Sequence, residues 1–201
     1  MKSKTKAIKH LKKDKKLKKL IEMTVLHESV KSKSCYGALV KSIVSQQLSV
    51  KAAASIYGRL LSLAKKPITK PAILRLSQEQ LRSVGLSNSK ANYVKNVATF
   101  FQENKITDKQ LINASDEDII SLLTQIKGVG VWTVQMMLMF QLDRPDVLPL
   151  GDLEIRKQII KLYDIRKEGK ELYPAIEAAV ESWRPYRTLA CRYLWAHSNQ
   201  Y

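Results

Sequence analysis

Apolar residues recur at helical spacing along most of this chain, whereas alternating runs of β-branched residues, which are typical of strands, are nearly absent. The segments with helical spacing cover residues 36–64, 76–104, 114–142, 152–165, 173–183 and 185–198. The first of them is interrupted around residues 45–49 (SQQLS), so it predicts one or two buried helices. The pattern therefore predicts an all-α fold.

Residues 76–104 and 114–142 each predict a helix, a short turn and a second helix. Both begin with a serine that is followed three residues later by an acceptor side chain, Ser77 with Gln80 and Ser115 with Asp118. This spacing is typical of a capped helix start, and two independent uses of a common signal would explain the likeness. Gly85 and Gly128 are expected to end the two first helices as left-handed C-caps.

The second of these segments contains the turn IKGVGVW, in which Gly128 and Gly130 flank Val129. Glycines let the backbone turn tightly and leave its amides accessible. Amides at the start of a helix form an anion site, which suits one phosphate of a nucleic-acid backbone, and Lys127 adds a positive charge beside it. A plain connector between two helices is the alternative. The helix that follows is apolar all round, so it is predicted to be buried on all sides.

A connector braced by Pro145 and Pro149 leads from this helix to Asp152, at the start of the next one. The simplest interpretation of Asp152 is an N-cap. The field at a helix N-terminus also keeps a carboxylate ionised in a partly desolvated place. A carboxylate held rigidly next to a phosphate-binding turn is costly unless it meets positive charge in a substrate. Asp152 is therefore also a candidate catalytic residue.

The formal charge of the 201 residues is +17, which points to a polyanion as partner, nucleic acid first and an anionic membrane second. Residues 1–20 contain ten lysines and one acid, Asp14. Apolar residues near helical spacing predict that this basic, partly helical segment docks on the body of the protein: Ile8, Leu11, Leu17, Leu20 and Ile21. Its lysines either face solvent only or contact DNA. A secretory signal and a membrane-spanning segment are not expected.

Cys35 and Cys191 are the two cysteines of the chain, and neither belongs to a CxxC motif or a histidine cluster. A zinc site and a four-cysteine iron–sulfur cluster are therefore not expected. Two free thiols in a reducing compartment are the prediction.

The run KGVGVWT, followed by VLPLGDLEIRK, resembles the helix-hairpin-helix, Gly/Pro-rich loop and aspartate motif of the helix-hairpin-helix DNA glycosylase superfamily. The likeness is to its alkylbase branch, the 3-methyladenine DNA glycosylases of type II. Further blocks resemble that branch in the same order, at 42–53, 81–98 and 183–195, so the resemblance covers about residues 8–198. It implies a two-lobed helical fold with the active-site cleft between the lobes. The glycosylase domain would span 21–201, with the hairpin at about 119–141.

The resemblance implies a monofunctional glycosylase that excises alkylated purines such as 3-methyladenine in base excision repair. Such enzymes flip the damaged nucleotide out of the duplex and hydrolyse the N-glycosidic bond. Asp152 matches the family's catalytic aspartate. A fixed carboxylate there would stabilise the oxocarbenium-like sugar cation and orient or deprotonate the attacking water. An alkylated purine already carries positive charge, so no strong general acid is needed.

The family's pattern also assigns residues around the base and along the DNA. Trp132 and Trp195 match pocket tryptophans, with core packing as the alternative, while Met136 and Leu153 stand where relatives have further aromatics. Gln47, beside Gln46 and Leu48, matches the residue that fills the gap left by the flipped base, with helix capping as its alternative. The DNA-binding turn would be formed by Lys127, Gly128, Val129 and Gly130. The main-chain carbonyls that would hold a monovalent cation are those of Thr124, Ile126 and Gly128.

Strand-cutting relatives place a lysine nucleophile where this chain has Trp132, so no Schiff base is expected. No cofactor is expected to be required beyond a monovalent cation at the hairpin. The expected partner is double-stranded DNA with damaged bases, and a monomer away from membranes is expected, cytoplasmic in a prokaryote or nuclear in a eukaryote. Two other classes stay open. These are a non-catalytic helix-hairpin-helix DNA-binding module and a basic protein that binds RNA or a membrane surface.

Overall fold

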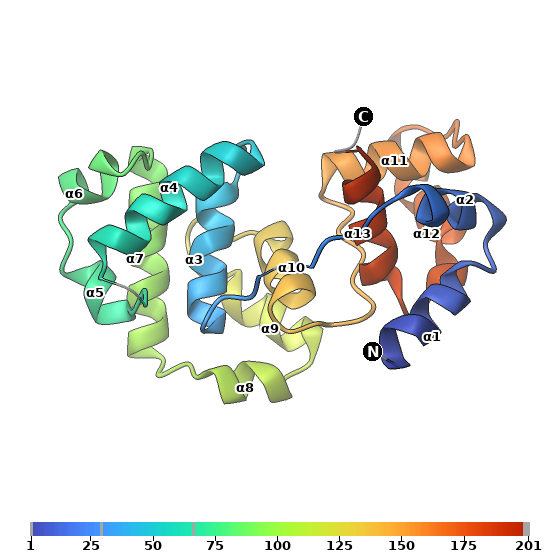
Figure 1. Cartoon of the computed structure of the whole chain (residues 1–201). Coiled ribbons are helices and arrows are strands. Elements are labelled where there is room, and N and C mark those ends of the chain that lie inside the picture. The colour runs from blue at the N-terminus through green and yellow to red at the C-terminus, as the bar shows by residue number, and fades with distance from the viewer. Residues whose placement is uncertain (1, 29, 66, 199–201) are drawn as a thin grey trace. The chain divides into compact units, whose positions relative to one another are not determined.

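The computed structural model describes residues 2–28, 30–65 and 67–198, and every regular element among them is a helix (Figure 1). The all-α prediction is therefore confirmed. The chain forms two compact units. Unit 1 comprises Met1–Ser29 and Asp143–Tyr201, and unit 2 comprises Val30–Leu142. Unit 1 is thus discontinuous in sequence, while unit 2 is a single stretch that contains the predicted hairpin.

In unit 2 the helix α3 packs against both α7 and α10 (Figure 1). The helices of this unit are α3 (Cys35–Ser45), α4 (Val50–Leu63), α5 (Lys70–Leu74), α6 (Gln78–Ser83), α7 (Asn88–Glu103), α8 (Asp108–Asn113), α9 (Asp116–Leu123) and α10 (Val131–Phe140). Six α10 residues between Thr133 and Met139 are buried, so α10 is largely buried, as its apolar composition predicts. Val131 at its start is 49% exposed, so the burial is not complete.

The interruption at SQQLS is confirmed, because α3 ends at Ser45 and α4 begins at Val50. The helix α3 is almost entirely buried, as predicted. The burial expected for the second part of this segment is wrong. Only Ala53 and Leu60 of α4 are buried, because α4 shows one apolar face to the unit and its other residues to solvent.

The predicted start signals are used in both helical hairpins. Ser77 and Gln80 form a complete capping box on α6, and the Ser115 hydroxyl accepts from the Asp118 amide at the start of α9. Gly85 follows α6 with φ +100°, as a left-handed cap requires. The expectation that Gly128 ends α9 is wrong. That helix already ends at Leu123, because further tight turns follow it before the chain reaches Gly128.

Unit 1 joins the two ends of the chain around α13, which packs against α2 and α11. Its elements are α1 (Lys2–Leu11), α2 (Lys15–Met23), α11 (Leu153–Tyr163), η1 (Gly169–Glu171), α12 (Leu172–Ala179), η2 (Glu181–Trp183) and α13 (Arg187–Ser198). Its core combines residues from both ends of the sequence, with Leu11 and Leu17 as fully buried as Ile155 and Trp183. None of the described helices is long and apolar enough to cross a membrane.

The N-terminal lysine-rich segment forms two helices of unit 1, α1 and α2. Asp14 separates α1 from α2 and caps α2, and the Tyr163 hydroxyl donates a hydrogen bond to its carboxylate. The Trp183 indole N–H in turn donates to that hydroxyl at 3.0 Å. Leu11, Leu17, Leu20 and Ile21 are buried as predicted, while Ile8 is only half-buried and Ala7 takes the buried place.

Candidate functional site

The two glycines of the hairpin turn differ in whether the fold itself requires glycine at their position. Gly128 has φ +100°, and a β-carbon there would overlap the ring of Tyr93 in α7, so glycine is required. Gly130 has an ordinary extended backbone (φ −97°, ψ 172°) and open space around the position of a β-carbon. Any residue fits the fold at Gly130. The need for glycine there would come from a ligand that approaches the backbone.

Gly130 is the N-cap of α10, so the amides at the start of this helix have no acceptors within it. Gly130 is exposed and Lys127 is exposed close by in the turn. Val129 points its side chain into the core, with 4% exposure, so only its backbone is left for a ligand. Exposed helix-start amides with a neighbouring lysine are the arrangement that an anion site requires. The phosphate-binding role of Lys127, Gly128, Val129 and Gly130 stays a prediction.

One face of α7 supports this turn. Lys90, Tyr93 and Asn96 are spaced three residues apart, so they lie along the same side of the helix. The Asn96 side-chain amide donates to the Lys127 carbonyl at 3.1 Å, and the Tyr93 ring packs where Gly128 has no side chain. Sequence reasoning did not find these residues. Their spacing within the block 81–98 was the available signal.

Lys90 holds the end of α3. Its ammonium donates to the carbonyls of Val44 at 2.8 Å and Gln46 at 2.6 Å. Burial lowers the pKa of Lys90 from its usual value. A positive charge against the last carbonyls of a helix is favourable for the helix dipole. Lys90 of α7 therefore fixes the start of the turn between α3 and α4.

Gln47 lies at the exposed tip of that turn with φ +54°, a left-handed conformation that is uncommon for a residue other than glycine. Leu48 beside it is 40% exposed. The side chain of Gln46, in contrast, turns inward and donates to Thr133 Oγ1 at 2.9 Å and to the Gly128 carbonyl at 3.3 Å. The amide that reaches the backbone thus belongs to Gln46, and the DNA contact assigned to Gln47 stays a prediction.

The carbonyls proposed to hold a monovalent cation belong to Thr124, Ile126 and Gly128. The Ile126 carbonyl accepts from the Val129 amide at 2.9 Å, and the Gly128 carbonyl accepts from Gln46. Each carbonyl oxygen has a second lone pair, so these bonds leave room for a weak oxygen-bound cation. Cation binding stays a prediction.

The predicted base-pocket residues are divided between the two units. Trp132 is half-buried and Met136 is buried, both on α10 of unit 2. Leu153 is 56% exposed at the start of α11, and Trp195 is half-buried on α13, both in unit 1. The pocket itself, with these four residues as its walls, stays a prediction.

Asp152 is held by two elements of unit 1. It is the N-cap of α11, where its Oδ1 accepts the Ile155 amide at 2.9 Å. The same oxygen accepts the indole N–H of Trp195 at 3.2 Å. The N-cap interpretation is therefore correct, and Trp195 adds a donor that a cap does not need. The two donors hold the carboxylate in a fixed orientation at the N-terminus of α11.

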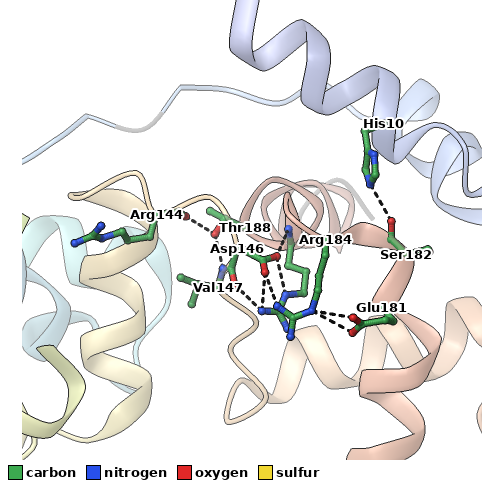
Figure 2. A network of polar contacts seen from close by, with 9 residues as sticks. His10, Arg144, Asp146, Val147, Glu181, Ser182, Arg184 and Thr188 are labelled. Atoms are coloured by element: carbon green, nitrogen blue, oxygen red, sulfur yellow. Dashed lines mark hydrogen bonds and ion pairs between the residues drawn. The ribbon is translucent and has the colours of Figure 1, made fainter. Parts of the chain in front are cut away.

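The connector before Asp152 is clamped to the start of α13 (Figure 2). Asp146 forms ion pairs with Arg184 at 2.6 Å and with Arg187 at 2.8 Å. The Thr188 hydroxyl donates to the Arg144 carbonyl at 2.6 Å and accepts the Val147 amide at 3.0 Å. The prolines suggested a rigid connector, but these polar contacts fix it. Because α13 also carries Trp195, one helix holds both the connector and the aspartate.

Both cysteines are buried and poorly suited to nucleophilic chemistry. Burial, with the negative charge of Asp108, raises the pKa of Cys35 to about 12. Burial likewise raises the pKa of Cys191. Thiols with such pKa values are protonated near neutral pH and are weak nucleophiles.

Comparison with known proteins matches residues 40–185 to a family described as "HhH-GPD superfamily base excision DNA repair protein". The chain belongs to this superfamily. A relative within it is DNA-3-methyladenine glycosylase 1 of Schizosaccharomyces pombe, 36% identical over 187 residues, which are 92% of this chain and 81% of that protein. The putative DNA-3-methyladenine glycosylase YfjP of Bacillus subtilis is 31% identical over 81% of this chain, and the match spans 58% of that protein.

The HhH-GPD fold is also found by structural comparison. The S. pombe 3-methyladenine DNA glycosylase Mag1, solved in complex with abasic DNA, superposes with a TM-score of 0.83 at 34% identity. The superposition covers 94% of this chain and 95% of that one. The predicted two-lobed helical glycosylase fold with a helix-hairpin-helix motif is thereby confirmed. The resemblance to 3-methyladenine DNA glycosylases is confirmed as well.

Proposed function

We propose that this HhH-GPD protein is a monofunctional DNA glycosylase that removes alkylated purines such as 3-methyladenine from double-stranded DNA. The observation that carries the proposal is the hold on Asp152, which is fixed by the start of α11 and by the Trp195 indole. The relatives described above support the substrate class, since they are named for 3-methyladenine.

In the proposed reaction Asp152 stays ionised while the bond between base and sugar breaks. Its carboxylate stabilises the positive charge that develops on the sugar and orients the water that attacks it. The alkylated purine leaves as a neutral base, because it carries a positive charge before cleavage. Trp195 keeps the carboxylate in one orientation, so little reorganisation is needed during the reaction. Water is the only co-reactant.

Duplex binding in this proposal begins with phosphates. The α10 amides at Gly130 with exposed Lys127 offer one phosphate site, and the net charge of +17 attracts the backbone over a longer range. The lysines of α1 and α2 extend this charge on unit 1. Leu11, Leu17, Leu20 and Ile21 of these helices are buried in the core, so they are not available to enter a membrane. DNA is the partner that this surface favours.

Replacing Lys6, Lys9 and Lys13 together by glutamine tests this part of the proposal. All three are exposed, so the fold should be unaffected. We expect weaker binding to every duplex sequence and a salt dependence whose slope is shallower by up to about 3, at about 0.9 for each lost phosphate contact. Fluorescence anisotropy at several salt concentrations measures both. The matched control replaces three exposed lysines of unit 2, Lys65, Lys105 and Lys109. An equal change in both triple variants would contradict a specific N-terminal contact.

The alternative is a helix-hairpin-helix module that binds DNA without catalysis, in which Asp152 is only a cap. An excision assay on duplex DNA containing labelled 3-methyladenine decides between the two. Release of the free base supports the glycosylase. Tight binding with no release at any enzyme concentration supports the module.

The products should be strands with intact abasic sites. Trp132 stands two residues after Gly130, at the position where strand-cutting relatives have a lysine. Its indole offers no amine to the sugar. We therefore expect nicks only after hot alkali treatment of the product, and no covalent adduct with borohydride. A protein–DNA adduct trapped by borohydride in good yield would show that the reaction class is wrong.

A further inference from the structure

We propose that Gln46 is a positioning residue that couples the two exposed turns of unit 2, the hairpin turn at 124–130 and the α3–α4 turn at 46–49. Lys90 is its brace. This inference rests on the proposed function, because it assigns both turns to one DNA duplex. It adds that contact of the duplex with one turn sets the geometry of the other.

The side-chain amide of Gln46 fits its place chemically. The Gly128 carbonyl can only accept a hydrogen bond, so the NH2 group, at 3.3 Å, must face it. The second N–H then points to Thr133 Oγ1 at 2.9 Å. Thr133 is 2% exposed, so its hydroxyl depends on partners within the protein. One amide thereby satisfies a buried hydroxyl and a turn carbonyl.

These contacts lie at the two sides of the predicted phosphate site. Gly128 precedes the Gly130 cap, and Thr133 is the third residue of α10, whose first amides would face the phosphate. A shift of Gln46 would therefore be transmitted to the start of α10.

The tip of the α3–α4 turn is held under strain. Gln47 has φ +54°, a left-handed conformation that is unfavourable for a residue other than glycine. Such a conformation persists only where the surroundings fix it. Here Lys90 binds the carbonyls of Val44 and Gln46 from one side, and the Gln46 side chain binds the hairpin on the other.

Two apolar residues that follow Gln47 are exposed at this tip. Leu48 is 40% exposed and Val50, the first residue of α4, is 79% exposed. An exposed apolar tip next to a phosphate site suits partial insertion between base pairs, a contact that intact stacked DNA resists and a site lacking a base permits. Accurate placement of the tip would therefore matter most for DNA with a missing or flipped base.

Gln46→Met tests the coupling, because methionine keeps the size and charge of the residue and removes both N–H donors. We expect the preference for a duplex with a stable abasic-site analogue over the same intact duplex to fall about tenfold. Affinity for the intact duplex should fall much less, because stacked DNA does not admit the tip of the α3–α4 turn, and the slope of its salt dependence should stay the same because no charge is removed. Gln102→Met, the same change at an exposed position of α7, is the control and should behave as wild type.

Two further variants separate positioning from loss of fold. Thr133→Val removes the same bond from the other side, so it should lower the preference similarly, and the double variant should lose no more than either single one. Lys90→Met should also lower the preference, while Lys90→Arg should largely restore it. Melting temperatures identify any variant that is simply unfolded, and Thr133→Val then serves in place of Gln46→Met.

The outcomes distinguish this inference from the proposed function. A wild-type protein that neither excises 3-methyladenine nor prefers the abasic analogue would overturn the function. A wild type that does both, with folded Gln46→Met and Thr133→Val variants that keep the full preference, would overturn the coupling alone. Equal losses on abasic and intact duplexes would also overturn it, because they would indicate a general structural role.

Discussion

Asp152→Asn is expected to lower the rate of 3-methyladenine excision by at least about a hundredfold while the protein stays folded. Asparagine is as good an N-cap as aspartate, and its carbonyl oxygen can accept from the Ile155 amide and from Trp195 as Asp152 does. The substitution therefore removes the charge and little else. Single-turnover excision with enzyme in excess measures the chemical step, and the melting temperature checks the fold.

DNA affinity should stay equal or rise in this variant. A carboxylate near the duplex repels its phosphates, and the asparagine does not. A variant that binds abasic DNA at least as tightly as wild type but does not excise would have lost only transition-state stabilisation. Near-normal turnover would show that Asp152 is a cap and nothing more.

The chain offers a matched control at Asp14. This residue also caps a helix of unit 1 and also accepts a hydrogen bond from an aromatic side chain, that of Tyr163. Asp14→Asn makes the same chemical change in the same kind of environment. We expect full excision activity and a stability loss of at most about 1 to 3 kcal/mol, from a weakened partly buried hydrogen bond. Loss of activity in both variants would point to a common effect on unit 1.

The helices of this fold could be predicted because their signals are local. The apolar composition of α10, the serine caps at Ser77 and Ser115, and the break at SQQLS all depend on residues a few positions apart. The N-cap role of Asp152 was predictable for the same reason. The error at Gly128 shows the limit of local rules. A glycine after a helix suggests a C-cap, but this glycine is required by the Tyr93 ring.

The contacts that hold the candidate residues could not be predicted, because they join distant parts of the chain. Gln46 and Thr133 are 87 residues apart, and Asp152 and Trp195 are 43 apart. The clamp of Asp146 by Arg184 and Arg187 similarly depends on folding the connector against α13. The sequence pattern predicted which residues carry chemistry, by their resemblance to a family. It did not show which residues hold them in place, since a hydrogen bond between distant residues leaves no periodic pattern in the sequence.

Gly130→Asp is expected to weaken binding to every duplex about tenfold or more without destabilising the protein. The structure alters the usual expectation for replacing a glycine. Gly130 has an extended backbone with open space around it and stands at the N-cap of α10, where aspartate is a favoured residue. Its carboxylate would accept the α10 amides and stabilise the helix by a few tenths of a kcal/mol relative to glycine. The melting temperature should therefore stay the same or rise slightly.

The contact that stabilises the helix weakens DNA binding, because the same amides are the proposed phosphate ligands. An aspartate that occupies them competes with the phosphate and repels it. One fewer counterion would be released on binding, so the salt dependence should be shallower by about 0.9. Gly130→Asn is the control, since asparagine caps the helix without a charge and should weaken binding less. Normal binding by Gly130→Asp at several salt concentrations would mean that the turn only joins α9 to α10, whatever the outcome at Asp152.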